Sequence, residues 1–264
     1  LNDLPFEPTN SQAAAINDIR QEIFSAKKML RILQGDVGSG KTVVAIAACL
    51  QAISKNKQAC VIAPTTVLAK QHLSYFRKFL EKFNFNIELL TSANTKKQKE
   101  KILQNLRDGK IDILISTHAV LEDDVMFKDL GLAVIDEQHR FGVMQRLKLY
   151  NKGEDVDVLL MSATPIPRSL MMALYGDMDI SILNEKPKNR QEISTLIMSH
   201  EKIADNYESL RRAIAKGEKV YWICPAIDEE NEVELASVTK RFNELLKIFG
   251  AENVVLLHGK MSEK

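Results

Sequence analysis

Hydrophobic residues along this chain fall into short apolar runs separated by longer stretches with helical spacing. The apolar runs predict six strands: "MLRIL" (29–33), "ACVIA" (59–63), "IELL" (87–90), "DILIS" (112–116), "LAVID" (132–136) and "DVLLMSA" (157–163). The segments between them have the 3.6-residue period of helices, as over 65–83. Strands that are apolar along their length and alternate with helices are typical of a parallel sheet covered on both faces. The pattern therefore predicts an α/β domain.

The pattern is interrupted around "NEKPKNRQE" (184–192), which is polar and charged. A second series follows, with strands predicted over 193–198, 219–226 and 253–259 and helices over about 200–216 and 233–249. We predict a first domain over 1–185, a linker over 186–193 and the N-terminal part of a second domain over 194–264. Three strands and two helices make a thin domain, so we expect this second domain to be incomplete.

Composition narrows the class of protein. The chain has 264 residues, of which 45% are hydrophobic, enough for a large buried core. The net charge of +1 predicts no overall basic field, although a local basic patch is enough to bind nucleic acid. We expect a cytoplasmic protein without a membrane partner, because no apolar run has the length of a membrane span and the N-terminus lacks a signal-peptide pattern.

The cysteines and the lysine cluster indicate ordinary structural roles. Cys49, Cys60 and Cys224 are scattered and form no C-x-x-C pair, which favours reduced core thiols over a metal site. The lysine-rich "TKKQKEK" (95–101) is interpreted as the solvated face of a helix.

The stretch "RILQGDVGSGKT" (31–42) fits the phosphate-binding pattern G-x-x-x-x-G-K-[ST]. Its glycines let the backbone turn with N–H groups inward, and the positive end of the following helix attracts phosphate oxygens. A chance glycine-rich turn is the alternative, but a strand before the loop and a buried helix after it are the setting that the pattern requires. We expect the nucleotide phosphates to bind Gly35, Asp36, Val37, Gly38, Ser39, Gly40, Lys41 and Thr42.

Two carboxylates, Asp136 and Glu137, lie at the end of the apolar strand "LAVID" and supply the second half of this site. A P-loop enzyme needs an acid there to hold Mg²⁺, so we expect Thr42 and Asp136 to hold the metal while Lys41 reaches the β- and γ-phosphates. Glu137 is placed to orient and deprotonate the attacking water, which predicts a hydrolase rather than a kinase. An ordinary acidic turn at a strand end is the alternative, and the P-loop upstream favours the catalytic role.

Asp136-Glu137-Gln138-His139 resembles the D-E-x-H box of superfamily-2 helicases. "APTTVLAKQH" (63–72), "STHAVL" (116–121) and "SATPIPR" (162–168) have the order and spacing of that superfamily's further motifs. Together with "LPFEPTNSQ", "DEQHRFGVMQR", "GDMDISIL", "VYWICPAIDEE" and "HGKM", they make the whole chain similar to the RecG family of DNA helicases and translocases. The transcription-repair coupling factor is the alternative relative, and Gln138 with "YWICP" favours RecG.

The resemblance implies two RecA-like domains with ATP and Mg²⁺ in the cleft between them. It implies that Phe6 stacks on adenine and that Gln12 hydrogen-bonds its edge, which suits an aromatic ring and an amide. Without the resemblance, Phe6 would be a core anchor and Gln12 a residue of an N-terminal helix. The residues expected to link the nucleotide state to domain movement are Gln138, His139, Ser162 and Thr164.

The resemblance also places nucleic acid over the first domain. Helix openings after strands offer free N–H groups to a backbone phosphate, and such contacts carry no base specificity. A histidine that only closes a turn is the alternative at His118. The expected contact residues are Pro64, Thr65, Thr66, Thr117, His118 and Arg168. The expected partner is branched or forked DNA, bound by a monomer in DNA repair and recombination.

Two other classes of protein stay open: a P-loop enzyme with a small-molecule substrate, and a module that binds nucleotide without turnover. In RecG-like motors, arginines downstream of the segment that is His258-Gly259 here reach the γ-phosphate. The arginines Arg211, Arg212 and Arg241 match no such motif. We therefore expect this chain to bind Mg-ATP but to hydrolyse little of it.

Overall fold

The computed structural model describes residues 7–137, 149, 152–153, 155–164, 178–185, 193–199, 202–224, 238–258 and 261. The chain divides into two compact units, Leu1–Gln191 and Glu192–Lys264. The division falls inside the segment 186–193 that the sequence predicts as a linker. Each unit is described by itself below.

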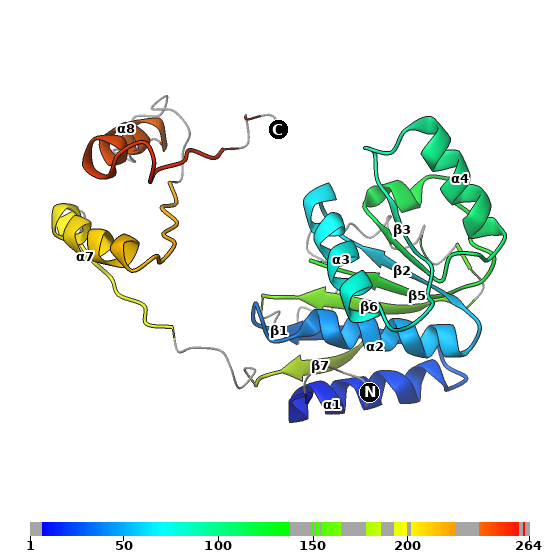
Figure 1. The fold of residues 1–264 in the computed structure, drawn as a ribbon. Helices are drawn as coiled ribbons and strands as arrows, with labels where there is room; N and C mark the ends of the chain where they lie inside the picture. Colours follow the sequence, from blue (N-terminus) through cyan, green and yellow to red (C-terminus); the bar gives the residue numbers. More distant parts are fainter. Residues whose placement is uncertain are drawn as a thin grey trace. The chain divides into compact units, whose positions relative to one another are not determined.

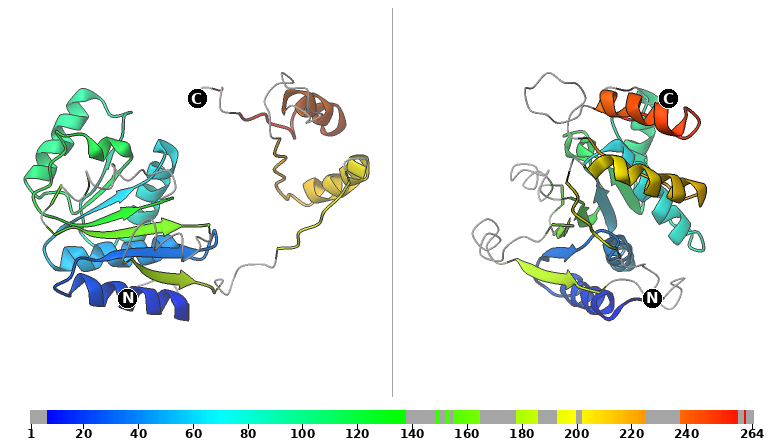
Figure 2. Two further views of the ribbon diagram at one scale, coloured as in Figure 1. Left: turned by 180° about the vertical axis from the view of Figure 1, so that it is seen from behind. Right: turned by 90° about the vertical axis from the view of Figure 1, so that its left-hand side faces the viewer.

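A seven-stranded parallel sheet forms the centre of the first unit (Figures 1 and 2). Its strands are β1 (Leu30–Gly35), β2 (Gln58–Ile62), β3 (Ile87–Leu90), β4 (Ile113–Ser116), β5 (Leu130–Ile135), β6 (Asp157–Ser162) and β7 (Asp179–Leu183). Their spatial order is β3-β4-β2-β5-β6-β1-β7, and every pair is parallel. The six predicted strands and the predicted α/β class are confirmed.

Strand β7 is the one strand of this sheet that the apolar pattern did not predict. It pairs with β1 at the edge of the sheet and alternates between exposed and buried residues. Asp179 and Ser181 interrupt its apolar character. An edge strand needs only one buried face, so its pattern is weaker than that of a central strand.

Helices cover both faces of this sheet. The helices are α1 (Asn10–Ile23), α2 (Lys41–Ser54), α3 (Thr66–Phe79) and α4 (Lys96–Arg107), with a 3₁₀ turn η1 (His118–Leu121). One core joins α1, α2 and α3 to the sheet, and a second core on the other face includes α4 and η1. The lysines of the "TKKQKEK" segment lie on α4 and are largely exposed, which confirms a solvated helix face.

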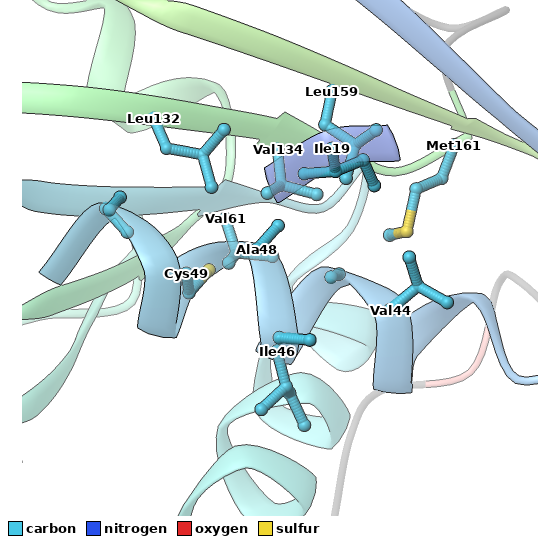
Figure 3. Packing of buried hydrophobic residues seen from close by; sticks show 14 of the residues in the cluster. Ile19, Val44, Ile46, Ala48, Cys49, Val61, Leu132, Val134, Leu159 and Met161 are labelled. Atoms are coloured by element: carbon cyan, nitrogen blue, oxygen red, sulfur yellow. The ribbon is translucent and has the colours of Figure 1, made fainter. Parts of the chain in front are cut away.

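The side chains of helix α2 are buried on nearly every side of the helix, which is typical of a helix in the centre of a core. Every residue from 43 to 49 is buried. Figure 3 shows Val44 and Ala48 pointing toward Val134 and Met161 of the strands, while Ile46 points away from them. Cys49 on this helix is buried, and the burial raises the pKa of its thiol to about 12. This helix carries Lys41 and Thr42 at its first turn, so the core holds the P-loop in place.

A buried arginine joins α1 and β7 to β1. Arg31 is 7% exposed. Its Nε donates to Glu22 at 2.8 Å and its Nη1 donates to the Ser181 hydroxyl at 2.8 Å, with Asp18 also 3.7 Å from Nη1. A buried charge is tolerated when it is paired and hydrogen-bonded in this way. The network fixes α1 beside the strand that leads into the P-loop.

The second unit contains α7 (Ile203–Ala215) and α8 (Val238–Phe249), which confirms the two helices predicted there. The strands predicted over 193–198, 219–226 and 253–259 are wrong for the described residues, which form no strand in these segments. Most of their large apolar side chains are exposed: Ile193, Leu196, Ile197, Met198, Val220, Tyr221, Ile223, Val255 and Leu257. A strand forms only where a neighbouring backbone takes its hydrogen bonds, and an apolar pattern alone does not supply one.

Candidate nucleotide and nucleic-acid site

Parallel pairing brings the predicted site residues to one edge of the sheet. The carboxyl ends of β4, β2, β5, β6 and β1 lie side by side in that order. In the register, Ser116 faces Ile62, Ile62 faces Ile135, and Ser162 faces Gln34. The P-loop, the Asp136-Glu137 pair and the turns after β2, β4 and β6 therefore open from the same edge, where open parallel sheets bind ligands.

The P-loop turns tightly between β1 and α2 because of its glycines. Gly38 and Gly40 have φ values of 78° and 88°, a region that favours glycine. A Cβ on Gly35 would lie 2.5 Å from the Ser39 hydroxyl oxygen, so a side chain does not fit there. The loop is closed by the Ser39 N–H, which donates to the Asp36 carbonyl at 3.1 Å. The Ser39 hydroxyl is buried and has no hydrogen-bond partner among the described residues.

The Lys41 ammonium lies over this loop. Its Nζ donates to the carbonyls of Gly35 at 2.6 Å and Asp36 at 3.1 Å. Burial lowers the pKa of Lys41, and the negative charges of Asp136, Glu137 and Asp36 act against that lowering. The lysine is therefore within the electrostatic reach of both carboxylates, although they lie about a hundred residues away along the chain.

Asp136 and Glu137 follow β5 directly. The Asp136 N–H donates to the Ile62 carbonyl at 2.9 Å, which ties the start of this turn to β2. Its Oδ1 accepts from the Glu137 N–H at 3.0 Å, and its Oδ2 accepts from Nε2 of His72 at 2.8 Å. Glu137 has a φ of 52°, which is uncommon for a residue with a side chain and tends to occur at functional sites.

The residues present fit a magnesium ion bound together with a nucleotide. The hydroxyl of Thr42 and the carboxylate of Asp136 are hard oxygen donors, the type that Mg²⁺ prefers, and Mg²⁺ sites usually add phosphates and water to one or two carboxylates. The described residues hold no group of three or more His, Cys, Asp and Glu side chains that could bind a metal ion by themselves.

Ser162 and Thr164 form a compact turn after β6. The Ser162 hydroxyl donates to the Thr164 carbonyl at 3.0 Å and accepts from the Thr164 N–H at 3.2 Å. Ser162 is buried and faces Gln34, the residue before the P-loop begins. The turn is thus placed next to the P-loop, while its role in coupling stays a prediction.

The turns after β2 and β4 open from the same edge of the sheet, and these two strands are neighbours. Thr65 caps α3, because its hydroxyl accepts from the Leu68 N–H at 3.2 Å. Thr117 precedes η1, and His118 is exposed at its start. Pro64 and Thr66 are partly exposed. The structure brings these residues together, and their contact with DNA stays a prediction.

Gln12 lies in the first turn of α1, which agrees with the alternative of an N-terminal helix residue, but it makes a contact that the sequence did not indicate. It is 2% exposed, and its Nε2 donates to the Ser39 carbonyl of the P-loop at 2.7 Å. Its Oε1 accepts from the Thr9 N–H at 3.0 Å in a capping box at the start of α1. Its side chain also occupies the space that a Cβ on Gly40 would need. Gln12 therefore joins α1 to the P-loop, and its contact with adenine stays a prediction.

We expect Gln12→Ala to lower the free energy of unfolding by about 1–3 kcal/mol, since a buried acceptor loses its donor, and to weaken ATP binding. Gln98→Ala is the matched control, because Gln98 completes the same kind of capping box on α4 but is exposed. Urea unfolding and titration with a fluorescent ATP analogue measure both effects. Equal losses in the two variants would show that the link to Ser39 contributes nothing.

Four predicted residues lie outside the described part of the chain: Phe6, Gln138, His139 and Arg168. Within the part that is described, no helix is both long and apolar enough to cross a membrane.

Residues 9–173, more than half of the chain, match the DEAD/DEAH box helicase family. The chain belongs to this family. It is similar to the ATP-dependent DNA helicase RecG of Thermotoga maritima (43% identical over 265 residues), of Aquifex aeolicus (42% over 266) and of Bacillus subtilis (42% over 262). These matches cover 99–100% of this chain but 34–38% of the relatives, so the chain spans about a third of their length.

Solved structures agree with this assignment to the DEAD/DEAH box helicases. A structure of RecG bound to a three-way DNA junction matches with a TM-score of 0.79 and 42% identity, over 94% of this chain and 32% of that one. The DEAD-box helicase Mss116 bound to single-stranded RNA and UDP-BeF matches with a TM-score of 0.61 at 19% identity, over 81% of this chain and 49% of that one. The second likeness supports the RecA-like helicase fold alone.

Two long-range contacts near the predicted site residues escaped the sequence-based prediction. His72 ends the quoted segment "APTTVLAKQH", yet nothing local connects it to Asp136. Glu185, two residues after β7, accepts from the N–H groups of Asn10 at 3.0 Å and Ser11 at 3.2 Å and so caps α1. Both contacts join residues far apart in the chain, and a single sequence carries no signal for such pairs.

Proposed function

We propose that this chain is the ATP-binding core of a RecG-type DNA helicase that remodels branched DNA in repair and recombination. The observation that carries the proposal is that the P-loop with Lys41 and the Asp136-Glu137 pair open from the same edge of the sheet, which also carries the turns after β2 and β4. The similarity to RecG helicases over the full chain supports DNA rather than a small molecule as the partner. The domain limits 1–185 and 194–264 are part of the same proposal.

On the nucleotide side, we give each predicted residue a distinct role. The P-loop N–H groups and the buried Ser39 hydroxyl donate to phosphate oxygens, and Lys41 turns from the loop carbonyls to the β- and γ-phosphates. Thr42 and Asp136 hold Mg²⁺, which neutralises phosphate charge when bound. Glu137 accepts the proton of the attacking water. Phe6 and Gln12 select adenine.

On the DNA side, the turns after β2 and β4 bind the phosphate backbone. The N–H groups of the first turn of α3 and the polar side chains of Thr117 and His118 are suited to phosphate oxygens. Arg168 adds a positive charge. Such contacts position the strand without selecting its sequence. Gln138, His139, Ser162 and Thr164 link the nucleotide state to movement along DNA. We also propose that the protein works as a monomer in the cytoplasm.

The test is the ATPase rate of a version extended to the length of the relatives, with and without a three-way DNA junction. We expect the junction to raise the rate at least several-fold and ATP to drive its conversion into separated or re-annealed strands. A linear duplex of the same length is the control. An ATPase rate that is the same with and without DNA would contradict the proposal and favour a P-loop enzyme with a small-molecule substrate.

A further inference from the structure

His72 links the helix that follows β2 to the turn that follows β5 at the same edge of the sheet. It lies on α3, which follows β2, while its partner Asp136 follows β5, and β2 and β5 are neighbours in the sheet. The Nε2 of His72 donates to Oδ2 of Asp136 at 2.8 Å. The two side chains are 10% and 15% exposed, so this bond is largely shielded from water. A hydrogen bond to a charged acceptor in such a setting is among the strong ones.

The ring of His72 packs against another ring of α3. It stands edge-on to the ring of Phe76, with centroids 6.4 Å apart and planes at 84°. Phe76 is fully buried in the core. His72 lies nearly two turns along the helix from Thr66, a distance of about 9 Å. A displacement at the first turn of α3 is therefore carried to His72 by one continuous, packed helix.

Asp136 in turn is held at both oxygens. Its Oδ2 accepts from His72, and its Oδ1 accepts from the N–H of Glu137. A shift of the His72 ring moves the carboxylate and, through it, the backbone of Glu137. The His72–Asp136 bond thus links helix α3 to the two acidic residues beside the P-loop.

We propose that His72 is a positioning residue that transmits occupancy of the first turn of α3 by a DNA phosphate to Asp136. The inference rests on the proposed function for what binds at each end. It has a thermodynamic consequence: DNA and the Mg-nucleotide bind cooperatively, each tightening the other by the same factor, and that factor depends on the His72–Asp136 bond.

The experiment measures this factor in the version extended to the length of the relatives. Fluorescence anisotropy gives the affinity for a labelled three-way DNA junction with and without a non-hydrolysable ATP analogue and Mg²⁺. A labelled analogue then gives the nucleotide affinity with and without DNA. We expect the two ratios to agree and to be about 5-fold or more in the unaltered protein, within the usual range of coupling.

Two variants separate the hydrogen bond from the packing of the ring. His72→Phe keeps an aromatic ring against Phe76 but has no N–H, and we expect its coupling to fall to within about 2-fold of none while each ligand still binds alone. His72→Gln keeps an N–H donor, and we expect it to retain most of the coupling. Tyr75→Ala is the control, because Tyr75 lies on the same helix, is 40% exposed and stacks on Phe79.

Coupling that survives in His72→Phe, or that is lost in His72→Gln, would overturn the role of the bond. If the phenylalanine variant does not fold, the glutamine variant alone decides. An unaltered protein that hydrolyses ATP in response to DNA but shows no coupling in binding would overturn this inference and leave the proposed function standing. A protein that neither binds the junction nor responds to it would overturn both.

Discussion

Replacing Glu137 with glutamine is expected to abolish most ATP turnover while leaving ATP binding intact. The amide can still orient a water molecule, but it cannot take the proton that the water must lose. Loss of a general base costs about 10²–10⁴-fold in rate. Glu137 directly follows Asp136, beside the P-loop lysine whose pKa its charge influences, and its left-handed backbone sets the direction of the side chain.

The measurement is a steady-state ATPase assay with DNA, in the version extended to the length of the relatives, beside a nucleotide titration. Glu81→Gln makes the same chemical change at an exposed position and serves as the control. Turnover of Glu137→Gln within about 2-fold of the unaltered protein would mean that another group takes the proton.

Replacing Lys41 with alanine is expected to weaken ATP binding by about 10- to 100-fold. A hydrogen bond to a charged group contributes about 1.5–3 kcal/mol, and each 1.4 kcal/mol is a factor of ten in affinity. Because Lys41 already lies over the loop on the carbonyls of Gly35 and Asp36, its charge is in place before the phosphates arrive. The variant also removes the positive charge that interacts electrostatically with Asp136 and Glu137.

A fluorescent ATP analogue titrated into the chain measures this loss directly, and hydrolysis is not needed. Lys55→Ala is the matched control, since it removes the same charge just beyond the opposite end of α2, where Lys55 donates to the Ile23 carbonyl at 2.6 Å. Equal affinities for Lys41→Ala and the unaltered chain would remove the P-loop from the nucleotide site.

The pattern of residues within a short segment was enough to predict the features that depend only on residues close together in the sequence. Strands β2, β4 and β5 are buried along their whole length, and burial on both faces shows directly as an apolar run in a single segment. The P-loop is equally local, because its glycines at 38 and 40 adopt positive φ within one turn. The similarity to RecG helicases followed from several such segments in order, and 42–43% identity over the full chain supports it.

The sequence by itself therefore determined the central strands, the P-loop and the acidic pair, since each is encoded within a dozen residues or fewer. The α/β class followed from the order of these segments along the chain. Tertiary structure alone decided which residues meet: the His72–Asp136 bond, the Gln12 link to Ser39, the edge position of β7 and the absence of strands from the described apolar segments of the second unit. The physical reason is that a hydrogen bond or a strand pair needs a second segment. Where that segment lies is a property of the folded chain and not of the pattern around either partner.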